Sequence, residues 1–585
     1  MFRKTHALQA ALIAAAFLAI LASNGTANQP QPPERRVMAF YYPWYGVPEG
    51  PGGAGRTVHW GQINAANHDI AASTHYPALG AYDSHDPNVI DQHCTWAKQA
   101  GVDTFIISWW GHGDYTDRVM NEILDACARH ELRACIYYET VPQPRTPQSA
   151  AEDIIRVLRK YADHEAYLKA NGRPVVFIYG RAVNELGLLG WRQALQTIKA
   201  QYAGGVTAIG DQFSYGAARV FDGVHTYNTA GSITGMSLDA LAQWSSESYG
   251  SWVELADRAG RISTITVIPG YDDTKIRTPG LVAERHDGQS YRTQWQRAIE
   301  ADPHWVLITS FNEWHEGSEI EPSLEDGRQY LDLTAEYATP FKAAPRATHP
   351  AAAEPVITQE EMQKLRQALE GVRIAALPDA ESMAFWWLLG QGVDVTLLTW
   401  EDIATGKVTP ATYPMLLYCS GEHYRRSVHT EGDVDTALSA YLEAGGLLVF
   451  LPSQPWPFYY DETGATVNRS ARFGLTLRYG WEQPPSTDLE FVRSRRALPH
   501  LPGRFAFPTT GDLRWRGFQP DDHRQYTPML QLRGGSGDSL GDGIAYAAPA
   551  TGGRILYVWF GLLQGPYAEQ ITYDVLTLAT RNLTP

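Results

Sequence analysis

The 585-residue sequence contains few cysteines, and they form no recognisable pattern. Cys94, Cys127, Cys135 and Cys419 include no Cys-x-x-Cys pair and no spacing typical of metal ligands. We therefore expect neither a metal centre nor a dense disulfide framework. Cys127 and Cys135 form a disulfide only if the fold brings them together, and buried free thiols are the alternative.

Charged residues are also scarce. They make up 19% of the sequence, and the net charge at pH 7 is −16. Such an acidic chain is a poor partner for nucleic acid or anionic lipid. The sequence also lacks a Gly-rich phosphate loop and a basic cluster for a sugar phosphate, which argues against a glycosyltransferase-like enzyme. We expect no cofactor, and the oligomeric state stays open.

Only one hydrophobic run is long, and it lies at the N-terminus. Arg3 and Lys4 precede an apolar stretch from Ala7 to about Ala22, which small polar residues follow. This pattern predicts that residues 1–28 are a signal peptide and that the protein is secreted or periplasmic; a retained membrane anchor is the alternative. Removing residues 1–28 would change the net charge from −16 to −18. No later segment is long and apolar enough to span a membrane.

Short hydrophobic runs, by contrast, are frequent in the first part of the chain. Segments of helical periodicity separate most of them, and this alternation predicts a parallel sheet. Eight such units predict a closed (β/α)8 TIM barrel over residues 29–342, although residues 212–222 leave little room for a helix. The eight runs are 37–46, 103–111, 133–140, 173–181, 206–212, 222–228, 263–273 and 304–314.

The second part of the chain has a different organisation. Residues 343–371 begin with an Ala- and Pro-rich stretch and are predicted to be a linker. Four hydrophobic runs alternate with helical segments after it, and residues 470–565 look strand-rich. Residues 372–585 are therefore predicted to form a smaller doubly wound α/β domain with extra β-strands.

A cluster of acidic residues follows the eighth hydrophobic run. The segment "SFNEWHEGSEIEPS" at 310–323 contains Glu313 and Glu316, three residues apart. In a helical turn this spacing places both carboxyl groups on one face, with Cβ atoms roughly 5–6 Å apart. Because barrel active sites lie at the carboxyl ends of the strands, we interpret the pair as catalytic carboxylates rather than as a solvated acidic loop.

Five motifs extend this interpretation to a family. They are "YYPWYG" (41–46), "HWGQ" (59–62), "YDSHDP" (82–87), "AGVDTFIISWWG" (100–111) and "FNEWHEGSEIEPS" (311–323). In this order they resemble glycoside hydrolase family 99, the family of endo-acting α-mannosidases and α-mannanases. The resemblance implies a (β/α)8 barrel, no metal, and cleavage of α-mannosidic bonds with retention of configuration. It implies that Glu313 is the base that deprotonates the sugar 2-hydroxyl, giving an epoxide-like intermediate, and that Glu316 is the acid that protonates the leaving oxygen.

Other residues at strand ends and in these motifs are candidates for substrate binding. Ser318 and Glu319 depart from the threonine and glutamine more usual in the family, so an extra negative charge is expected near the site. A related group of polysaccharide-biosynthesis proteins has alanine where His315 stands, so His315 favours a hydrolase. A non-catalytic glycan-binding or polysaccharide-biosynthesis protein on the same barrel is the alternative function. The candidate substrate-binding residues are Tyr42, Tyr45, His59, Trp60, Trp109, Glu139, Tyr227, Asn312 and His315.

The C-terminal domain resembles, more loosely, the glutamine-amidotransferase-like domains that are attached to some glycosidases. Cys419 lies at the end of a hydrophobic run, where such a domain would carry its nucleophile. It lacks the Gly-x-Cys-x-Gly elbow, and no suitable histidine and glutamate pair follows it. We therefore expect an accessory domain without catalytic activity.

Overall fold

The computed structural model describes residues 34–347, 357–426, 433–494, 498–509, 511–519 and 523–583. The chain divides into two compact units, one that ends at residue 348 and one that begins at residue 349. The predicted signal peptide, residues 1–28, lies outside the described residues.

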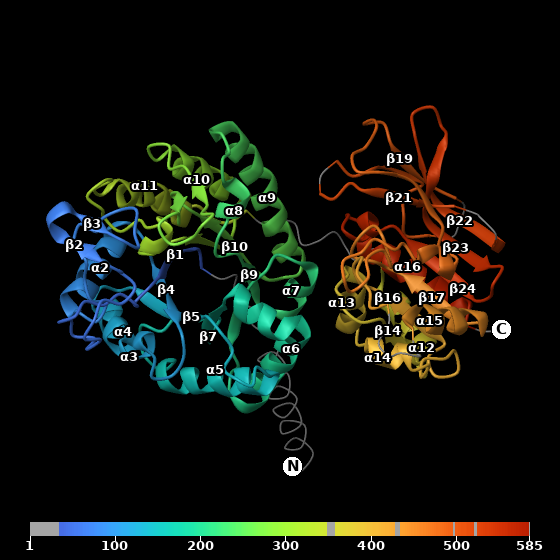
Figure 1. Cartoon of the computed structure of the whole chain (residues 1–585), viewed down its shortest axis with the longest axis horizontal. Helices are drawn as coiled ribbons and strands as arrows, with labels where there is room; N and C mark the ends of the chain where they lie inside the picture. Colours follow the sequence, from blue (N-terminus) through green and yellow to red (C-terminus); the bar gives the residue numbers. More distant parts are fainter. Residues whose placement is uncertain are drawn as a thin grey trace, which may run out of the picture. The chain divides into compact units, whose positions relative to one another are not determined.

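Eight parallel strands form a closed barrel in the first unit (Figure 1). They pair in the order β5-β4-β1-β13-β10-β9-β8-β7, and β5 also pairs with β7, which closes the ring. Each predicted hydrophobic run overlaps one of these strands, so the predicted (β/α)8 barrel is confirmed. The strands are β1 (Arg36–Tyr41), β4 (Thr104–Trp109), β5 (Arg133–Tyr138), β7 (Arg173–Ile178), β8 (Thr207–Asp211), β9 (Gly223–His225), β10 (Ile262–Val267) and β13 (Trp305–Ile308).

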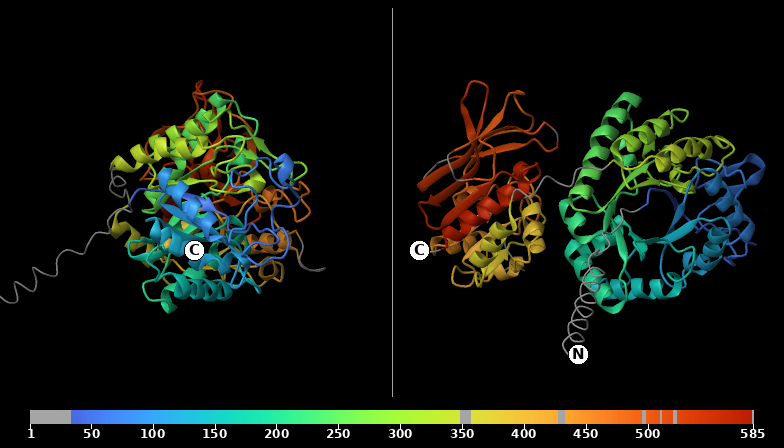
Figure 2. Two further views of the ribbon diagram at one scale, coloured as in Figure 1. Left: turned by 90° about the vertical axis from the view of Figure 1, so that its left-hand side faces the viewer. Right: turned by 180° about the vertical axis from the view of Figure 1, so that it is seen from behind.

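Helices surround the ring of strands and connect each strand to the next (Figure 2). The first begins where the sequence signals it, because Asp86 caps the helix with its side chain and Pro87 occupies the first helical position. The connection at 212–222 holds only a six-residue helix, as its length required. The helices are α2 (Pro87–Gln99), α3 (Tyr115–Arg118), α4 (Met120–Arg129), α5 (Pro147–Tyr161), α6 (Gly180–Gln201), α7 (Tyr215–Val220), α8 (Ala230–Ile233), α9 (Leu238–Arg258), α10 (Gln289–Ala301) and α11 (Gln329–Ala343).

The barrel interior is filled by alternate side chains of the strands. The ring of Phe40 on β1 packs against Tyr137 on β5 and His225 on β9, at centroid distances of 4.8 and 6.0 Å. Because successive side chains of a strand point to opposite faces, the residues two positions further on also point inward. These residues are Tyr42, Glu139 and Tyr227, and they lie at the carboxyl ends of the strands, where barrel enzymes bind their substrates.

Two long connections at this end of the barrel carry short strands of their own. The loop between β1 and α2 contains β2 (Ile63–Asn64) and β3 (Asp69–Ile70), and the loop between β10 and α10 contains β11 (Tyr271–Asp272) and β12 (Val282–Ala283). Each pair of short strands is antiparallel. The paired backbones give both loops a defined course beside the barrel mouth.

The second unit contains a mixed sheet. Five strands are parallel, in the order β15-β14-β16-β17-β24, and the sheet then continues through antiparallel strands. The parallel strands are β14 (Ile374–Ala376), β15 (Val395–Leu397), β16 (Met415–Tyr418), β17 (Leu447–Phe450) and β24 (Arg554–Val558). The antiparallel strands are β18 (Leu477–Trp481), β19 (Glu490–Arg493), β20 (Arg504–Ala506), β21 (Trp515–Phe518), β22 (His523–Arg533) and β23 (Ser539–Pro549). The helices are α12 (Gln359–Leu369), α13 (Met383–Gly390), α14 (Trp400–Ala404), α15 (Val434–Glu443) and α16 (Ala568–Arg581). The likeness of this unit to amidotransferases stays a prediction.

Helix α12 falls within residues 343–371 and corrects their assignment to the linker from residue 359 onward. Thr358 and Glu361 form a reciprocal capping box at its start. The Tyr573 hydroxyl of α16 donates to the carbonyl oxygen of Glu361 over 3.2 Å, so α12 packs as part of the second unit. The linker prediction followed composition and overlooked the Thr-x-x-Glu capping signal.

The four cysteines are free and buried, so Cys127 and Cys135 are not bridged. Within the described ranges, no helix combines the length and the hydrophobicity that a membrane span requires.

Candidate active site

The acidic motif forms a tight turn directly after the last barrel strand. Residues Trp314–Glu316 form a 3-10 helix, and Glu313 caps it by accepting a hydrogen bond from the backbone N–H of His315 over 3.1 Å. Gly317 ends the turn with φ +54°, and a Cβ there would approach the backbone of Asp272 to 3.2 Å. The turn therefore supplies the helical geometry that brings the side chains of Glu313 and Glu316 together.

Glu313 is buried, with 2% of its surface exposed. Its Oε1 accepts from the Tyr45 hydroxyl over 3.4 Å and lies 3.6 Å from His315 Nδ1. Burial raises the pKa of the Glu313 carboxyl well above its usual range, and the nearby charge of Glu316 raises it further.

Glu316 lies in a more polar setting. Its Oε1 accepts from both terminal nitrogens of Arg277, each over 3.2 Å, and its Oε2 accepts from the Tyr227 hydroxyl over 3.1 Å. Burial raises the pKa of Glu316, while Arg277 and Tyr227 oppose that rise. Because each charge disfavours the other, the two carboxyl groups titrate as a pair that keeps one proton.

Tyr45 is held in place from behind. The ring of Trp60 stacks on it at a centroid distance of 4.1 Å, and Trp60 Nε1 donates to the carbonyl oxygen of Tyr82 over 2.7 Å. Trp60 has no exposed surface, so it supports Tyr45 and does not itself face the site. Asn312 has a similar position, since its side chain bonds to the backbone N–H and carbonyl of Tyr42 over 2.8 and 3.2 Å.

Two histidines and a tryptophan form one wall beside the glutamates. The rings of His59 and Trp44 stack at 4.4 Å, and the His315 ring lies 5.2 Å from His59. His315 Nε2 is hydrogen-bonded to the carbonyl oxygen of His59. Burial and the neighbouring His315 lower the pKa of His59 to about 4, and burial also lowers that of His315. Both imidazoles are therefore uncharged at neutral pH.

Glu139 lies on the other side of the barrel mouth. Its carboxylate accepts from the Ser108 hydroxyl over 2.7 Å and lies 3.6 Å from Arg181 Nη2. Burial raises the pKa of Glu139 to about 7, against the opposing effects of Ser108 and Arg181. Asp211 lies nearby and is half-buried, and its carboxylate accepts from the backbone N–H of Tyr227 over 3.2 Å.

The prediction that Trp109 binds substrate was wrong, because its neighbour Trp110 faces the barrel mouth instead. Trp109 Nε1 donates to Asp117 over 2.9 Å, and its ring stacks on Tyr138, on the helix side of the strands. Trp110 instead points to the mouth, where its Nε1 donates to Ser108 over 3.0 Å. The pleat of β4 decides this, because Ser108 and Trp110 share the inward face. Successive side chains of a strand alternate between its faces, so the sequence predicts that only one of the two tryptophans points inward, but the register of the strand was needed to choose between them.

The other two glutamates of the motif are structural. Glu319 forms ion pairs with His75 and Arg285, at 2.6 and 2.8 Å. Arg285 and His75 hold the pKa of Glu319 below its usual value. Glu321 is buried and accepts from the Tyr82 hydroxyl over 2.7 Å and from His93 Nε2. The extra charge expected from Glu319 is therefore balanced by a histidine and an arginine.

Sequence reasoning missed two cationic residues and one aromatic residue of the site. Arg277 lies in the loop between β11 and β12. Arg181 is the second residue of α6, and its guanidinium lies 4.7 Å from the Trp110 ring. Trp44 lies within the "YYPWYG" motif but was not singled out. The one signal in the sequence near Arg277 was the polar C-terminal end of the predicted strand run 263–273, which leads into the loop that carries Arg277. Among the described residues, no group of three or more His, Cys, Asp or Glu side chains is arranged to hold a metal ion.

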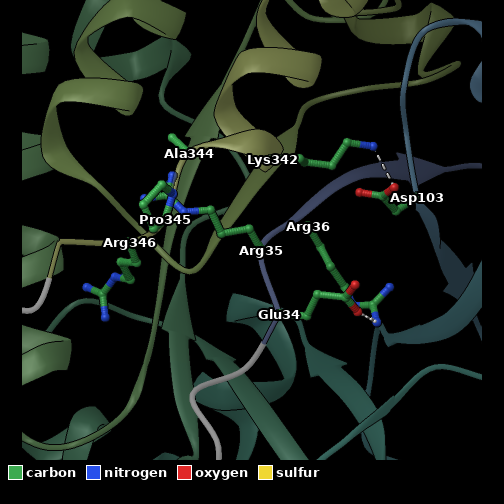
Figure 3. A pocket seen from close by; sticks show the side chains of 8 residues that line it. All are labelled: Glu34, Arg35, Arg36, Asp103, Lys342, Ala344, Pro345 and Arg346. Atoms are coloured by element: carbon green, nitrogen blue, oxygen red, sulfur yellow. Dashed lines mark hydrogen bonds and ion pairs between the residues drawn. The ribbon is translucent and has the colours of Figure 1, made fainter.

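A separate cavity of about 500 Å³ lies at the opposite end of the barrel strands (Figure 3). Arg36 begins β1 there, and Lys342 Nζ binds Asp103 over 2.7 Å. None of the candidate site residues lines this cavity, and catalytic sites of barrels lie at the carboxyl ends of the strands. The lining residues are Glu34, Arg35, Arg36, Asp103, Lys342, Ala344, Pro345 and Arg346.

Comparison with known proteins identifies the family of the barrel unit. The profile of Glycosyl hydrolase family 99 matches residues 32–339, more than half of the chain. The chain belongs to glycosyl hydrolase family 99. This family 99 protein is accordingly a glycoside hydrolase.

Individual relatives match about half of the hydrolase's chain. The glycoprotein endo-alpha-1,2-mannosidase of Rattus norvegicus is 27% identical over 337 residues, covering 51% of this chain and 70% of the rat protein. The enzyme of the same name from Xenopus laevis is 29% identical over 332 residues, covering 50% and 71%. Among solved structures, the GH99 endo-alpha-mannosidase from Bacteroides thetaiotaomicron is 29% identical, with a TM-score of 0.44, covering 53% of this chain and 98% of that one.

Proposed function

We propose that this hydrolase is exported and cleaves internal α-mannosidic linkages in mannan or in mannose-containing glycans, with retention of configuration. Membership of family 99 and the endo-alpha-1,2-mannosidase activity in the names of the relatives support the substrate class. The single observation that carries the proposal is the coupled pair Glu313 and Glu316 on one turn at the barrel mouth.

In the first proposed step, Glu313 acts as the base. Its ionised carboxylate removes the proton of the sugar 2-hydroxyl, and the freed oxygen attacks C1 to form a 1,2-epoxide. The bond between C1 and the leaving oxygen breaks, and Glu316 donates its proton to that oxygen. Tyr45 and the His315 backbone N–H stabilise the negative charge of Glu313 before the reaction.

The second proposed step reverses the roles. Glu316, now ionised, takes a proton from water, and the water oxygen attacks C1 and opens the epoxide. The sugar 2-oxygen takes its proton back from Glu313. Two inversions at C1 give net retention, and both glutamates return to their starting states. Arg277 and Tyr227 suit this step because they stabilise an ionised Glu316.

We further propose that the substrate contacts the polar groups around the pair. Tyr42, Tyr227, His59 and Glu139 have polar groups at the mouth, where sugar hydroxyls can bind. Glu139 belongs to a different strand from the pair and is proposed to bind hydroxyls without transferring protons.

Exchange of each glutamate tests the mechanism through leaving-group chemistry. Glu316→Gln should lose activity on natural mannosides by a factor on the order of 10²–10⁴ but retain turnover of a mannosyl donor with an activated aryl or fluoride leaving group, which needs no proton. Glu313→Gln should be poor on both, because deprotonation of the 2-hydroxyl is needed whatever departs. Steady-state kinetics with an α-mannan, a nitrophenyl donor and a fluoride donor measure this contrast.

Substrate and product analysis provide independent checks. A 2-deoxy or 2-O-methyl mannoside should not be cleaved, and the first product observed by NMR should be the α-anomer. A β-anomer as first product would refute retention. Binding of α-mannan without any cleavage, in protein with both glutamates present, would support the glycan-binding alternative instead.

A further inference from the structure

Glu316 has hydrogen-bond donors on both of its carboxylate oxygens. Arg277 donates twice to Oε1, over 3.2 Å each, and the Tyr227 hydroxyl donates to Oε2 over 3.1 Å. A carboxylate oxygen has two lone pairs, so Arg277 fills both acceptor positions of Oε1. Both contacts favour the ionised form of Glu316, whereas the first step of the proposed mechanism needs a protonated Glu316.

The two donors differ in their freedom to move. Tyr227 follows a barrel strand and is 5% exposed, and its ring packs 5.0 Å from Phe40 inside the barrel. Arg277 lies on the loop between β11 and β12, and 49% of its side chain is exposed. Of the two, only the guanidinium can withdraw without disturbing the barrel core.

The structure also provides a second partner for Arg277. Asp273, on the same loop, forms an ion pair with Arg277 Nη1, and its side chain is 1% exposed. The Tyr271 hydroxyl accepts from Arg277 Nη1 over 2.7 Å and donates to Asp273 over 2.9 Å. Asp273 also accepts from the Leu281 N–H over 2.7 Å, which fixes it to the loop. Asp273 therefore competes with Glu316 for the guanidinium.

The other titratable groups around Glu316 do not supply a positive charge. They come from each neighbouring element: Tyr42 after β1, Glu139 after β5, Tyr179 after β7, Tyr227 after β9, Tyr271 on β11, and Glu313 on the same turn. The tyrosines are neutral at working pH, and the glutamates are neutral or negative. Within the described part of the chain, Arg277 is the only cation in contact with Glu316.

We infer that Arg277 is a positioning residue that holds Glu316 ionised in the free enzyme, where the one proton of the pair is on Glu313. Arg277 withdraws from Oε1 before that proton passes from Glu313 to Glu316, which leaves Glu313 as the ionised base and Glu316 as the acid. Asp273 keeps the withdrawn guanidinium nearby, and its return stabilises the ionised Glu316 that activates water in the second step. This inference rests on the proposed function, in which Glu316 alternates between acid and base.

Removal of the guanidinium tests the inference through the pH dependence of kcat/KM. This profile reports the free enzyme, and its alkaline limb marks loss of the last proton from the glutamate pair. Arg277→Gln should move the alkaline limb upward by about one pH unit, the lower end of the effect of a nearby opposite charge, because Arg277 is half-exposed. Arg277→Lys, which keeps the charge, should restore most of the original position.

A variant of the competing carboxylate should act in the opposite direction. Asp273→Asn keeps an acceptor for the Leu281 N–H but removes the negative charge that competes for Arg277. The alkaline limb should then move downward. Arg181→Gln is the matched control, because Arg181 is a similarly exposed arginine of the barrel mouth that pairs with Glu139. Its alkaline limb should stay in place, whatever its effect on KM.

The two steps should also respond differently. With a nitrophenyl donor that makes the second step rate-limiting, Arg277→Gln should lower kcat several-fold, because the ionised Glu316 has lost its counter-ion. An unmoved alkaline limb in Arg277→Gln, with a melting temperature equal to that of the original protein, would overturn the inference. So would identical profiles for the Gln and Lys variants.

A titration without substrate separates this inference from the proposed function. The carboxyl carbon of Glu316 is observed by ¹³C NMR in Glu-labelled protein and assigned by its loss in Glu316→Gln. Its titration should shift upward in Arg277→Gln even if no mannoside is cleaved. Failure of the original protein to cleave any α-mannoside would reject the proposed function, whereas an unshifted Glu316 titration would reject the role of Arg277.

Discussion

The Tyr45 hydroxyl donates to Glu313 Oε1 over 3.4 Å, although 268 residues separate the two in sequence. The same hydroxyl accepts from the backbone N–H of Trp314 over 2.9 Å. Tyr45 thus joins the first barrel strand to the turn after the last one, and it places a hydrogen-bond donor against the proposed base.

Tyr45→Phe removes this donor. The hydrogen bond favours the ionised form of Glu313, so its loss should raise the pKa of that carboxyl. Because Glu313 holds the last proton of the pair while Arg277 keeps Glu316 ionised, the alkaline limb of the kcat/KM profile should move to higher pH. The value of kcat/KM at the optimum should fall about tenfold, the effect of about 1.4 kcal/mol.

Tyr167→Phe provides a matched control, because Tyr167 is equally buried but donates to the backbone carbonyl of Val175. It should lower the melting temperature without moving either limb. An alkaline limb that moves in both variants would show that the shift comes from altered packing and not from Glu313.

Glu139→Gln should separate substrate binding from stability. The buried carboxyl has a pKa of about 7, raised from 4.5, so stability is lost as pH rises through that range and the buried group ionises. From pH 4 to pH 8, the unfolding free energy of the variant should gain up to about 3 kcal/mol relative to the original protein.

Activity of Glu139→Gln should change in the other direction. The variant should mainly raise KM or lower kcat/KM, by about 1–3 kcal/mol, because a polar partner of the substrate is weakened. Denaturant unfolding at both pH values and Michaelis–Menten kinetics measure the two effects. Loss of all activity, including on fluoride donors, would instead place Glu139 in the catalytic machinery.

His75→Gln should make the barrel less stable in a pH-dependent way. The ion pair with Glu319 raises the pKa of His75, so its stabilisation is complete below the usual value near 6.5 and is lost as pH rises through the raised value. The variant should lose about 1 kcal/mol of unfolding free energy at pH 6, and the difference should shrink by pH 9. His164→Gln, which alters a more exposed His–Asp pair, is the control and should have little effect at either pH.

A chain that ends at residue 348 should retain hydrolysis. All the matched motifs and every residue of the candidate site precede this point, and the chain divides into two units there. We expect kcat/KM on a nitrophenyl α-mannoside within a few-fold of the full chain. A truncated protein that is folded by circular dichroism but inactive would show that residues after 348 contribute to the site.

Local pattern was sufficient to predict the barrel and the placement of Glu313 and Glu316 on one turn. Strand periodicity and helix capping depend on neighbouring residues, so the eight runs and the start of α2 at Asp86 could be read directly. Glu313 and Glu316 are three residues apart on a single turn, which is also a local relationship.

Only the tertiary structure decided how the remaining polar groups are used. Glu319 and Glu321 look like Glu313 and Glu316 in sequence, but partners from distant loops, such as His75 and Tyr82, make them structural. Trp110 rather than Trp109 faces the mouth because the register of β4 sets which side chain points inward. Arg277 reaches Glu316 across 39 residues through the folded loop between β11 and β12. Such pairings depend on how the chain closes on itself, because burial and nearby charge set the protonation of a carboxyl group, and both arise only when distant segments meet.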